Sequence, residues 1–263
     1  MRFDATRAAE ALEQARGAWG VSRLAPEIAP GDEAEGVAVQ RARAMLRRAD
    51  PPAGFKIGAT TAKMQDYLGL AGPIAGFMQA EDLHASGVSM AWADLRGPGV
   101  ECEIGVRLAA DLSPGPCSQA QAEAAVGDVF AAIEIVENRY GPPPSGDLQA
   151  VGVPVLVADQ VFHRAAVLGA PLAGWPGIDL AALGGRIMVD GTEQARGVGA
   201  DLLGHPMRAL AWLANSATAH GFGGLRAGQV IMLGSVTPPI WLAGPCVVEI
   251  IFDRLGQVSV SFQ

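Results

Sequence analysis

Two patterns of hydrophobic and polar positions divide the chain. Asp4–Trp19 is alanine-rich, carries spread charges and has glycines near its end, which predicts a helix. Ala34–Arg48 is predicted as a second helix, because a pair of prolines follows it. From about residue 54 the chain changes to short β-rich runs separated by glycine and proline. We therefore predict a mainly helical region over 1–70 and a β-rich core over 71–263, joined in one continuous structural unit.

The clearest strand pattern covers Val100–Leu108. Apolar residues alternate there with others, so Glu101 and Glu103 share the face opposite the apolar side chains. This alternation is typical of a half-buried strand. Further strands are predicted at Ala131–Val136, Ile187–Val189, Gln229–Leu233, Cys246–Phe252 and Val258–Phe262.

Two helices are predicted within this β-rich part. Gln121–Val129 is the first, and Val151–Val157 beyond it is a further apolar run. The second helix is His205–Gly221, which has Pro206 in its first turn and a glycine at its end. Many short strands with few helices favour a rolled or barrel-like sheet. The predicted fold class is therefore α+β: a mixed β-roll or barrel-like core with a helical N-terminal appendage.

Composition limits the classes of function. The 263 residues are 50% hydrophobic and 17% charged, which predicts a folded protein with a substantial core. The net charge of −8 argues against binding nucleic acid through its phosphates. A negatively charged substrate would need a local cation or a metal ion.

The cysteines and the hydrophobic runs suggest the compartment. Cys102, Cys117 and Cys246 form no CxxC pair, which favours a reducing environment. The first 20 residues are rich in charge and lack the apolar stretch of a signal peptide. No apolar run reaches the roughly 18 residues of a membrane span. We therefore expect a cytoplasmic protein without a membrane partner.

Glu101 and Glu103 are the most informative pair of residues. On one face of a strand, side chains two residues apart project roughly 6.5–7 Å apart. Two carboxylates at that spacing repel each other unless one is protonated or a cation lies between them. Mg²⁺ or Mn²⁺ would resolve the repulsion, since both favour oxygen ligands. A solvated strand face that carries two glutamates is the alternative.

Glu134 and Lys56 are single charges within apolar runs. A buried glutamate needs a partner, which could be a metal shared with the other two glutamates or an arginine such as Arg139. Lys56 and Lys63 are the only lysines among 19 basic residues. A lysine among apolar side chains can act in acid–base catalysis, whereas the alternative is a surface lysine with a buried stem.

Several kinds of site are absent from the sequence. The histidines form no HxH or HExxH arrangement, which argues against a histidine-rich zinc site; they are His84, His163, His205 and His220. The chain also lacks a GxSxG elbow, a P-loop and a GxGxxG fingerprint, so serine hydrolase and nucleotide chemistry are not indicated.

Ordered blocks from about residue 36 to residue 262 resemble the fumarylacetoacetate hydrolase superfamily, in its 2-keto-4-pentenoate hydratase and 4-oxalocrotonate decarboxylase branch. Lys56–Thr61 resembles the KxGLTS block, and Glu101–Ile104 resembles the ExEI strand. The remaining blocks are Gly76–Met78, Ile133–Tyr140, Val157–Asp159, Gly204–Ala214 and Leu255–Ser259. Their order and spacing carry the resemblance together.

The resemblance implies roles for individual residues. It makes Glu101, Glu103 and Glu134 ligands of Mg²⁺ or Mn²⁺, and it makes Lys56 the acid–base group, assisted by Glu81 or Asp82. Thr60, Asp159 and Ser235 are the corresponding expected substrate-binding residues.

The chain also departs from the family pattern. Gly99 replaces a basic residue, and Gln160, Val161 and Phe162 replace a run of small residues. The change at 160–162 puts bulk near the expected pocket, and each departure leaves the expected metal ligands unchanged.

The implied reaction is hydration of a 2-hydroxy-2,4-dienoate to a 4-hydroxy-2-keto acid. This hydration would pass through an enolate that the metal stabilises. Decarboxylation of a 2-oxo-3-enedioate would use the same kind of enolate and is the first alternative. Cleavage of an acylpyruvate would need a further base, and no histidine is indicated for it by the sequence. The last alternative is a non-catalytic, hydratase-like subunit. The resemblance implies a small 2-oxo acid substrate, a homo-oligomer and pairing with a decarboxylase as an option.

Overall fold

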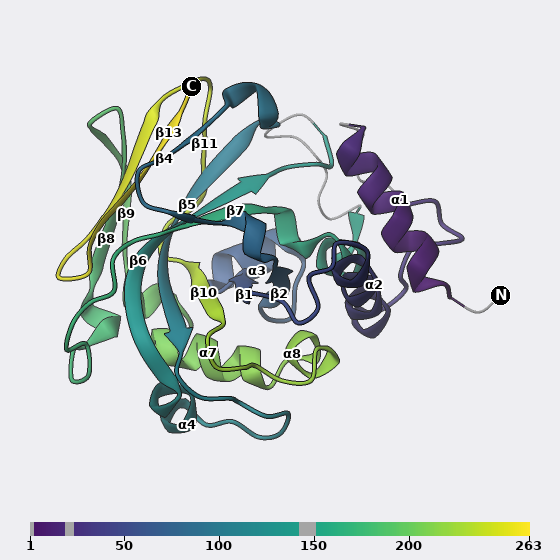
Figure 1. The fold of residues 1–263 in the computed structure, drawn as a ribbon, viewed down its shortest axis with the longest axis horizontal. Coiled ribbons are helices and arrows are strands. Elements are labelled where there is room, and N and C mark those ends of the chain that lie inside the picture. The colour runs from purple at the N-terminus through teal and green to yellow at the C-terminus, as the bar shows by residue number, and fades with distance from the viewer. Residues whose placement is uncertain (1–2, 19–23, 142–150) are drawn as a thin grey trace.

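Two sheets build the fold in the computed structural model, which describes residues 3–18, 24–141 and 151–263 (Figure 1). The larger sheet has the order β2-β1-β10-β5-β6-β7-β3, and β11 also pairs with β5. Parallel and antiparallel pairs are mixed, since β1 runs parallel to β10 whereas β5 and β6 are antiparallel. Its strands are β1 (Gly54–Gly58), β2 (Ile74–Met78), β3 (Leu83–Ala85), β5 (Pro98–Leu108), β6 (Val126–Glu137), β7 (His163–Leu168), β10 (Val230–Ser235) and β11 (Ile240–Trp241).

The smaller sheet has the order β4-β13-β12-β8-β9 and lies against β5 and β6 (Figure 1). Ile250, Val258 and Cys102 belong to one buried hydrophobic cluster, which joins the two sheets. The strands of the smaller sheet are β4 (Val88–Met90), β8 (Gly184–Val189), β9 (Thr192–Val198), β12 (Val247–Phe252) and β13 (Gly256–Phe262).

Helices cover the larger sheet and form the N-terminal part. Asp4 caps α1 by accepting from Thr6 N at 3.1 Å, and Asp32 caps α2 by accepting from Glu35 N at 2.8 Å. The α-helices are α1 (Ala5–Gly17), α2 (Glu33–Leu46), α3 (Ala62–Leu68), α4 (Gln119–Ala124), α6 (Val153–Ala158), α7 (Pro206–Ala214) and α8 (Ala217–Gly221). Short 3₁₀ helices are η1 (Ala80–Asp82), η2 (Trp92–Asp94), η3 (Gln160–Phe162), η4 (Leu180–Ala182) and η5 (Gly199–Asp201).

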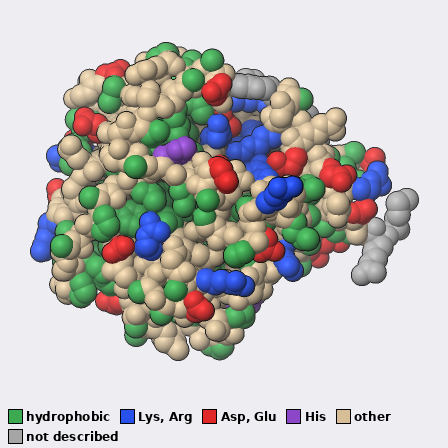
Figure 2. Space-filling model, in the orientation of Figure 1, with side chains coloured by type: hydrophobic (Ala, Val, Ile, Leu, Met, Phe, Trp, Pro, Cys, Tyr) green, Lys and Arg blue, Asp and Glu red, His purple; other side chains and the backbone are tan. Residues whose placement is uncertain are grey.

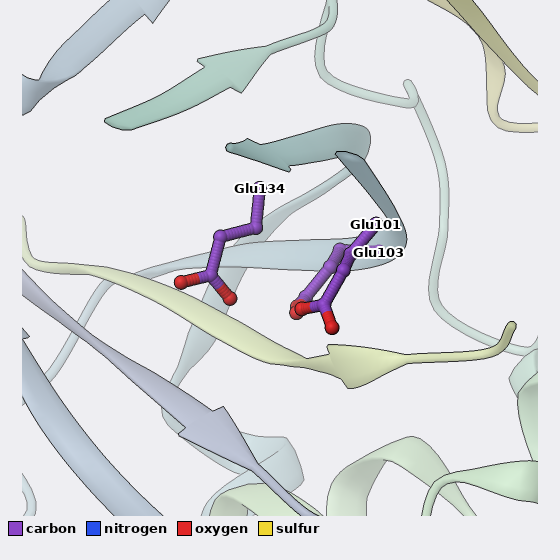
Figure 3. Close-up of side chains that lie close together, drawn as sticks. All are labelled: Glu101, Glu103 and Glu134. Atoms are coloured by element: carbon purple, nitrogen blue, oxygen red, sulfur yellow. The ribbon is translucent and has the colours of Figure 1, made fainter. Parts of the chain in front are cut away.

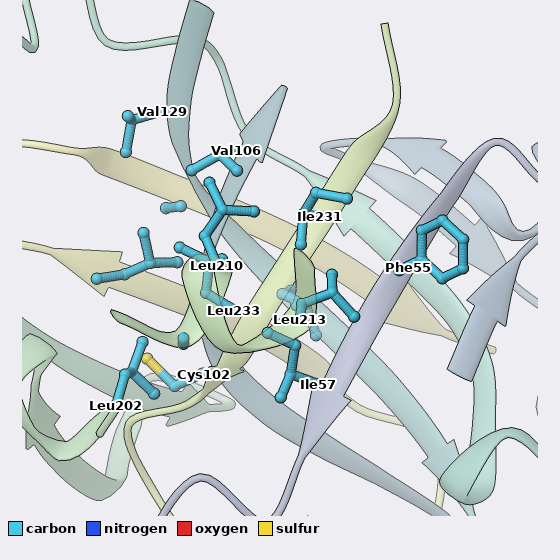
Figure 4. Close-up of a cluster of buried hydrophobic side chains, with 14 of the residues drawn as sticks. Phe55, Ile57, Cys102, Val106, Val129, Leu202, Leu210, Leu213, Ile231 and Leu233 are labelled. Carbon is cyan, nitrogen blue, oxygen red and sulfur yellow. The ribbon is translucent and has the colours of Figure 1, made fainter. Parts of the chain in front are cut away.

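The main hydrophobic core lies where α7 packs against the concave side of the larger sheet (Figures 1 and 4). Leu210 and Leu213 of α7 lie with Ile231 of β10 in this core, and all three are fully buried. Burying such side chains stabilises the fold by roughly 1.5–3 kcal/mol each. This core therefore supports the strands of the larger sheet that carry the polar side chains described below.

The α+β fold class with a curled core is confirmed, but several element boundaries differ from the sequence prediction. β1 lies inside the range 1–70 and is an interior strand of the larger sheet, between β2 and β10. The predicted helix Gln121–Val129 is wrong in its second half, because β6 begins at Val126. The β-branched and aromatic residues that follow favour a strand. The apolar run Val151–Val157 overlaps helix α6, which ends at Ala158.

The predicted helix His205–Gly221 is in fact two helices, α7 and α8. Asn215 Nδ2 donates to Ala211 O at 2.8 Å, and Ser216 Oγ accepts from Ala219 N at 3.1 Å. Both side chains compete with backbone hydrogen bonds, which explains the break. Trp19 and Gly20 at the end of the first predicted helix lie outside the described residues.

No helix within the described residues combines the length and the hydrophobicity that crossing a membrane requires.

Candidate active site

The three glutamates meet because of the register between β5 and β6. Glu101 lies directly opposite Glu134 across the antiparallel pair, and Glu103 lies opposite Ala132. Each glutamate places a carboxylate oxygen within 4.8 Å of the other two (Figure 3). The predicted spacing along β5 therefore supplies two of the carboxylates, and the strand pairing adds the third.

Burial and hydrogen bonding leave part of this trio unsatisfied. Glu103 and Glu134 are fully buried, whereas Glu101 is half-buried. Glu103 Oε2 accepts from Gly234 N at 2.8 Å, but its Oε1 has no hydrogen-bond partner among the described residues. Glu134 Oε2 likewise lacks a partner there. Buried polar atoms without partners are costly, so these oxygens need a ligand.

Burial and the closeness of three carboxylates shift the pKa values of the glutamates. Burial and the neighbouring Glu134 raise the pKa of Glu101 to about 8. Burial, Glu134 and Glu101 raise the pKa of Glu103 well above its usual range. Burial also raises the pKa of Glu134, but Lys56 and His163 outweigh burial and lower it. A divalent cation would relieve the repulsion between these groups, and three convergent carboxylates suit the hard ions Mg²⁺ and Mn²⁺.

Lys56 is buried in β1 and faces the trio. Its side chain is 2% exposed, and its Nζ lies 3.2 Å from Glu134 Oε1. This exposure excludes the alternative of a surface lysine. The pairing of β1 with β2 and β10 carries Lys56 to the site from a distant part of the sequence. Arg139, the alternative partner for Glu134, instead contacts Glu137 and Asp159.

A cavity of about 150 Å³ opens beside Lys56 and Glu101. Among its described lining residues Lys56 is the cation and Glu101 the anion, with Asn138 as a further polar group. The remaining lining residues are Gly58, Ala59, Met64, Leu68, Val136, Val161, Phe162, Pro239 and Trp241. The cavity therefore has one charged end and mostly apolar walls, which include the departures Val161 and Phe162.

Glu81 and Asp82 belong to a different hollow from Lys56. Both line a space of about 520 Å³ that several arginines also line, and Figure 2 shows basic and acidic side chains gathered in a hollow on one face. Glu81 is exposed, and Asp82 Oδ1 accepts from Gln79 Nε2 at 3.1 Å. These positions do not bring Glu81 or Asp82 into the cavity of Lys56. A catalytic role for Glu81 or Asp82 stays a prediction.

Thr60 and Ser235 lie near the trio and support its backbone. Gly234 has a φ of +110°, and a Cβ there would meet the Thr60 side chain at 2.5 Å. Thr60 thus packs against the glycine whose N–H holds Glu103. Ser235 Oγ accepts from Cys102 N at 3.1 Å and donates to Cys102 O at 3.3 Å. Substrate binding by either residue stays a prediction.

Asp159 is buried in an ion network away from the cavity. Arg139 Nε lies 3.0 Å from Asp159 Oδ2, and Arg43 Nη1 lies 3.1 Å from Oδ1. The Tyr140 hydroxyl donates to Oδ2 at 3.1 Å. These contacts occupy both oxygens, so we expect Asp159 to organise the protein rather than to bind substrate.

His163 is the residue that sequence reasoning missed. It is fully buried, and its Nδ1 lies 2.9 Å from Glu134 Oε1. Motif searches overlooked it because its partners Glu134 and Asp82 are distant in sequence. Its place next to the bulky departures at 160–162 was the available signal, since a histidine among apolar residues needs a polar partner.

Comparisons with known proteins show which proteins this chain is similar to. The family model "Fumarylacetoacetate (FAA) hydrolase C-terminal" matches residues 62–263. A 2-keto-4-pentenoate hydratase of Burkholderia vietnamiensis is 32% identical over 88% of this chain and 87% of its own length. A 2-hydroxyhexa-2,4-dienoate hydratase of Comamonas testosteroni is 30% identical over 96% of this chain and 94% of its own.

Among solved structures, the 4-oxalocrotonate decarboxylase from Pseudomonas putida G7, complexed with magnesium and adipate, is similar to this chain with a TM-score of 0.85. It is 26% identical, and the match covers 98% of this chain and 97% of that one. The curled sheet and the N-terminal helices are therefore shared across nearly the whole length.

Proposed function

The chain belongs to the fumarylacetoacetate hydrolase family, and on that premise we propose that it is a divalent-metal-dependent hydro-lyase. Its reaction adds water to a 2-hydroxy-2,4-dienoate and gives a 4-hydroxy-2-keto acid. The observation that carries this proposal is a buried glutamate trio beside Lys56, at the charged end of a mostly apolar cavity. The relatives named as hydratases match most of the chain.

Glu101, Glu103 and Glu134 would hold Mg²⁺ or Mn²⁺. Glu103 and Glu134 each have an oxygen without a partner among the described residues, which fits this assignment, and the similar decarboxylase was solved with magnesium. A bound ion would act as a Lewis acid toward the carboxylate and keto oxygens of a 2-oxo acid.

The chain's own residues would bind the substrate and move its protons. The reaction moves one proton from the 2-hydroxyl group to carbon 5, and the elements of water are then added across carbons 3 and 4. Lys56 Nζ is at the cavity and can hold and pass on a proton there. The apolar walls keep bulk water away from the reacting chain, and Asn138 can orient a polar group by hydrogen bonding.

The apolar walls favour hydration over decarboxylation of a dicarboxylic acid. A 2-oxo-3-enedioate carries a second carboxylate, and burying it without a cation is costly. Among the described lining residues the cation is Lys56, which already pairs with Glu134. The similar decarboxylase, which was solved with adipate, keeps decarboxylation as the second candidate.

Substrate comparison tests the choice between the two reactions. We expect turnover of a 2-hydroxy-2,4-dienoate with a hydrogen or alkyl tail. The loss of its conjugated absorbance measures this turnover. The dienoate with a carboxylate tail serves as the comparison substrate, and we expect it to react more slowly. If the protein released carbon dioxide from a 2-oxo-3-enedioate and hydrated neither dienoate, the proposed function would be decarboxylation instead of hydration. No turnover of any of them would favour a non-catalytic subunit.

Metal binding tests the ligand assignment. Titration of the metal-free protein with Mn²⁺, followed by electron paramagnetic resonance, should show one site in the wild type. Glu103→Gln removes a buried ligand and should abolish that site, whereas the exposed Glu123→Gln should not change it. Equal binding by wild type and Glu103→Gln would contradict the assignment.

We further propose that the protein works in the cytoplasm as a homo-oligomer. All three cysteines are free thiols, as expected in a reducing compartment. Met45 is 66% exposed and Leu46 48% exposed at the end of α2, which provides apolar surface for a second copy. Light scattering after size-exclusion chromatography tests the homo-oligomer, and the same measurement on a mixture with a decarboxylase tests the pairing.

A further inference from the structure

His163 lies behind the glutamate trio rather than in the cavity. It begins β7, is fully buried and is not among the residues that line the space beside Lys56. Its Nδ1 lies 2.9 Å from Glu134 Oε1, and its Nε2 lies 3.7 Å from Asp82 Oδ2. The ring is therefore enclosed between two carboxylates, one in the trio and one outside it.

The two oxygens of Glu134 have different surroundings. Oε1 receives both Lys56 Nζ at 3.2 Å and His163 Nδ1 at 2.9 Å. Oε2 is buried and has no partner among the described residues. Two donors on one oxygen fix the plane of the carboxylate, and they leave the other oxygen available for a ligand. A carboxylate accepts hydrogen bonds, so the proton in the contact with His163 belongs to Nδ1.

We propose that His163 is a positioning residue, which holds Glu134 by donating from Nδ1 so that its second oxygen is presented to a divalent metal. This inference rests on the metal site proposed above. Hydrogen bonds to ligating carboxylates typically change metal affinity 10- to 100-fold when they are removed. The buried Asp82 Oδ2 lies 3.7 Å from the opposite end of the ring, at His163 Nε2, too far for a hydrogen bond.

His163 and Lys56 have different tasks in this arrangement. Lys56 lines the cavity, so its ammonium can move toward a substrate and weaken its contact with Glu134. His163 faces no substrate and has a short, rigid side chain. Its hydrogen bond keeps Glu134 oriented while Lys56 takes part in proton transfer.

Two variants of similar size separate the hydrogen bond from simple packing. His163→Asn places an amide N–H near the position of Nδ1, whereas His163→Leu fills the space without a donor. Metal-free proteins are titrated with Mn²⁺ and followed by electron paramagnetic resonance. We expect the Leu variant to bind about 10- to 100-fold more weakly and the Asn variant to stay within a few-fold of wild type. His163→Ala is the second non-donor if the Leu variant does not fold.

The exposed His220→Ala is the matched control, and it should bind Mn²⁺ as the wild type does. Near-ultraviolet circular dichroism of each metal-free variant verifies that the fold is retained. Wild-type affinity in the folded non-donor variants would overturn the positioning role and leave the metal site in place. An Asn variant as weak as the Leu variant would overturn the hydrogen-bond explanation. A wild type that binds no Mn²⁺ would instead overturn the proposed metal site.

Discussion

Two buried groups of charged residues lie close to the end of β6, and they are balanced in opposite ways. In the first group, three carboxylates lie together, Glu134 among them contacts Lys56 and His163, and the pKa values of Glu101 and Glu103 are raised. In the second group, Arg43, Arg139 and the Tyr140 hydroxyl surround Asp159. Burial raises the pKa of Asp159, but the two arginines outweigh it and lower that pKa to about 2.

The difference separates a binding site from a structural support. Asp159 has partners on both oxygens, so folding alone satisfies it. Glu103 and Glu134 each keep an oxygen without a partner among the described residues. Such an arrangement costs stability in the free protein, and binding of a cation can recover it. The charge balance of a buried group is therefore a guide to its role.

The largest effect is expected for Asp159→Ala. It removes the shared partner of two buried arginines, and breaking such a buried pair from one side costs about 3–5 kcal/mol in the free energy of unfolding. Urea denaturation measures the loss. Glu193→Ala removes the exposed partner of Arg196 and should leave stability nearly unchanged. If Asp159→Ala were as stable as wild type, Asp159 would not be the structural support that the comparison makes it.

Lys56→Ala should lower turnover at least about 100-fold, the usual scale for losing a general acid–base group. Lys56→Arg should not restore it, because a guanidinium does not release its proton near neutral pH. Loss of dienoate absorbance with saturating Mg²⁺ gives the rate, and thermal unfolding records any loss of the contact with Glu134. The exposed Lys63→Ala is the control. Full activity in both Lys56 variants would remove this lysine from the mechanism.

Acid should weaken the Asp159 group. Its pKa is lowered from 3.8 to about 2, so its contribution to stability is complete above the unfolded value and is lost as pH falls through the folded value. The shift corresponds to about 2 kcal/mol that disappears between roughly pH 5 and pH 2. Urea denaturation of wild type and Asp159→Asn across this range measures it. If the free energy of unfolding of the two proteins depended on pH in the same way, the lowered pKa of Asp159 would not be the cause.

The smallest effect is expected for Glu103→Gln in the metal-free protein. A carboxyl group with a raised pKa costs stability as pH rises above its unfolded value, and the amide removes that cost. At pH 8 we expect the variant to be more stable than wild type by about 1 kcal/mol, a common size for a stabilising substitution. The advantage should shrink at pH 5. A less stable variant at both pH values would show that Glu103 is structural, like Asp159.

Local pattern in the sequence was enough to predict the strand that supplies Glu101 and Glu103. Alternation along Val100–Leu108 fixes which face carries the carboxylates, and β5 has those bounds within two residues. The register that adds Glu134 depends on pairing with β6, which no local pattern contains. The family resemblance supplied it. The same resemblance suggested Asp82 as a catalytic residue, and its contacts place it outside the cavity.

Sequence reasoning missed one feature that is local and one that depends on long-range strand pairing. The break between α7 and α8 depends on side-chain caps at Asn215 and Ser216, which compete with a continuous apolar pattern. His163 gains its meaning only when β7 pairs with β6 and brings it beside Glu134.

The register of β5 against β6 has a consequence for how this sequence can drift. A single inserted residue inside either strand would turn every side chain beyond it to the opposite face, and the carboxylates would no longer meet. An insertion in the connection at 111–117 changes neither strand, so the trio stays aligned. We therefore expect insertions and deletions among descendants of this gene to accumulate in that connection and to be purged from 98–108 and 126–137.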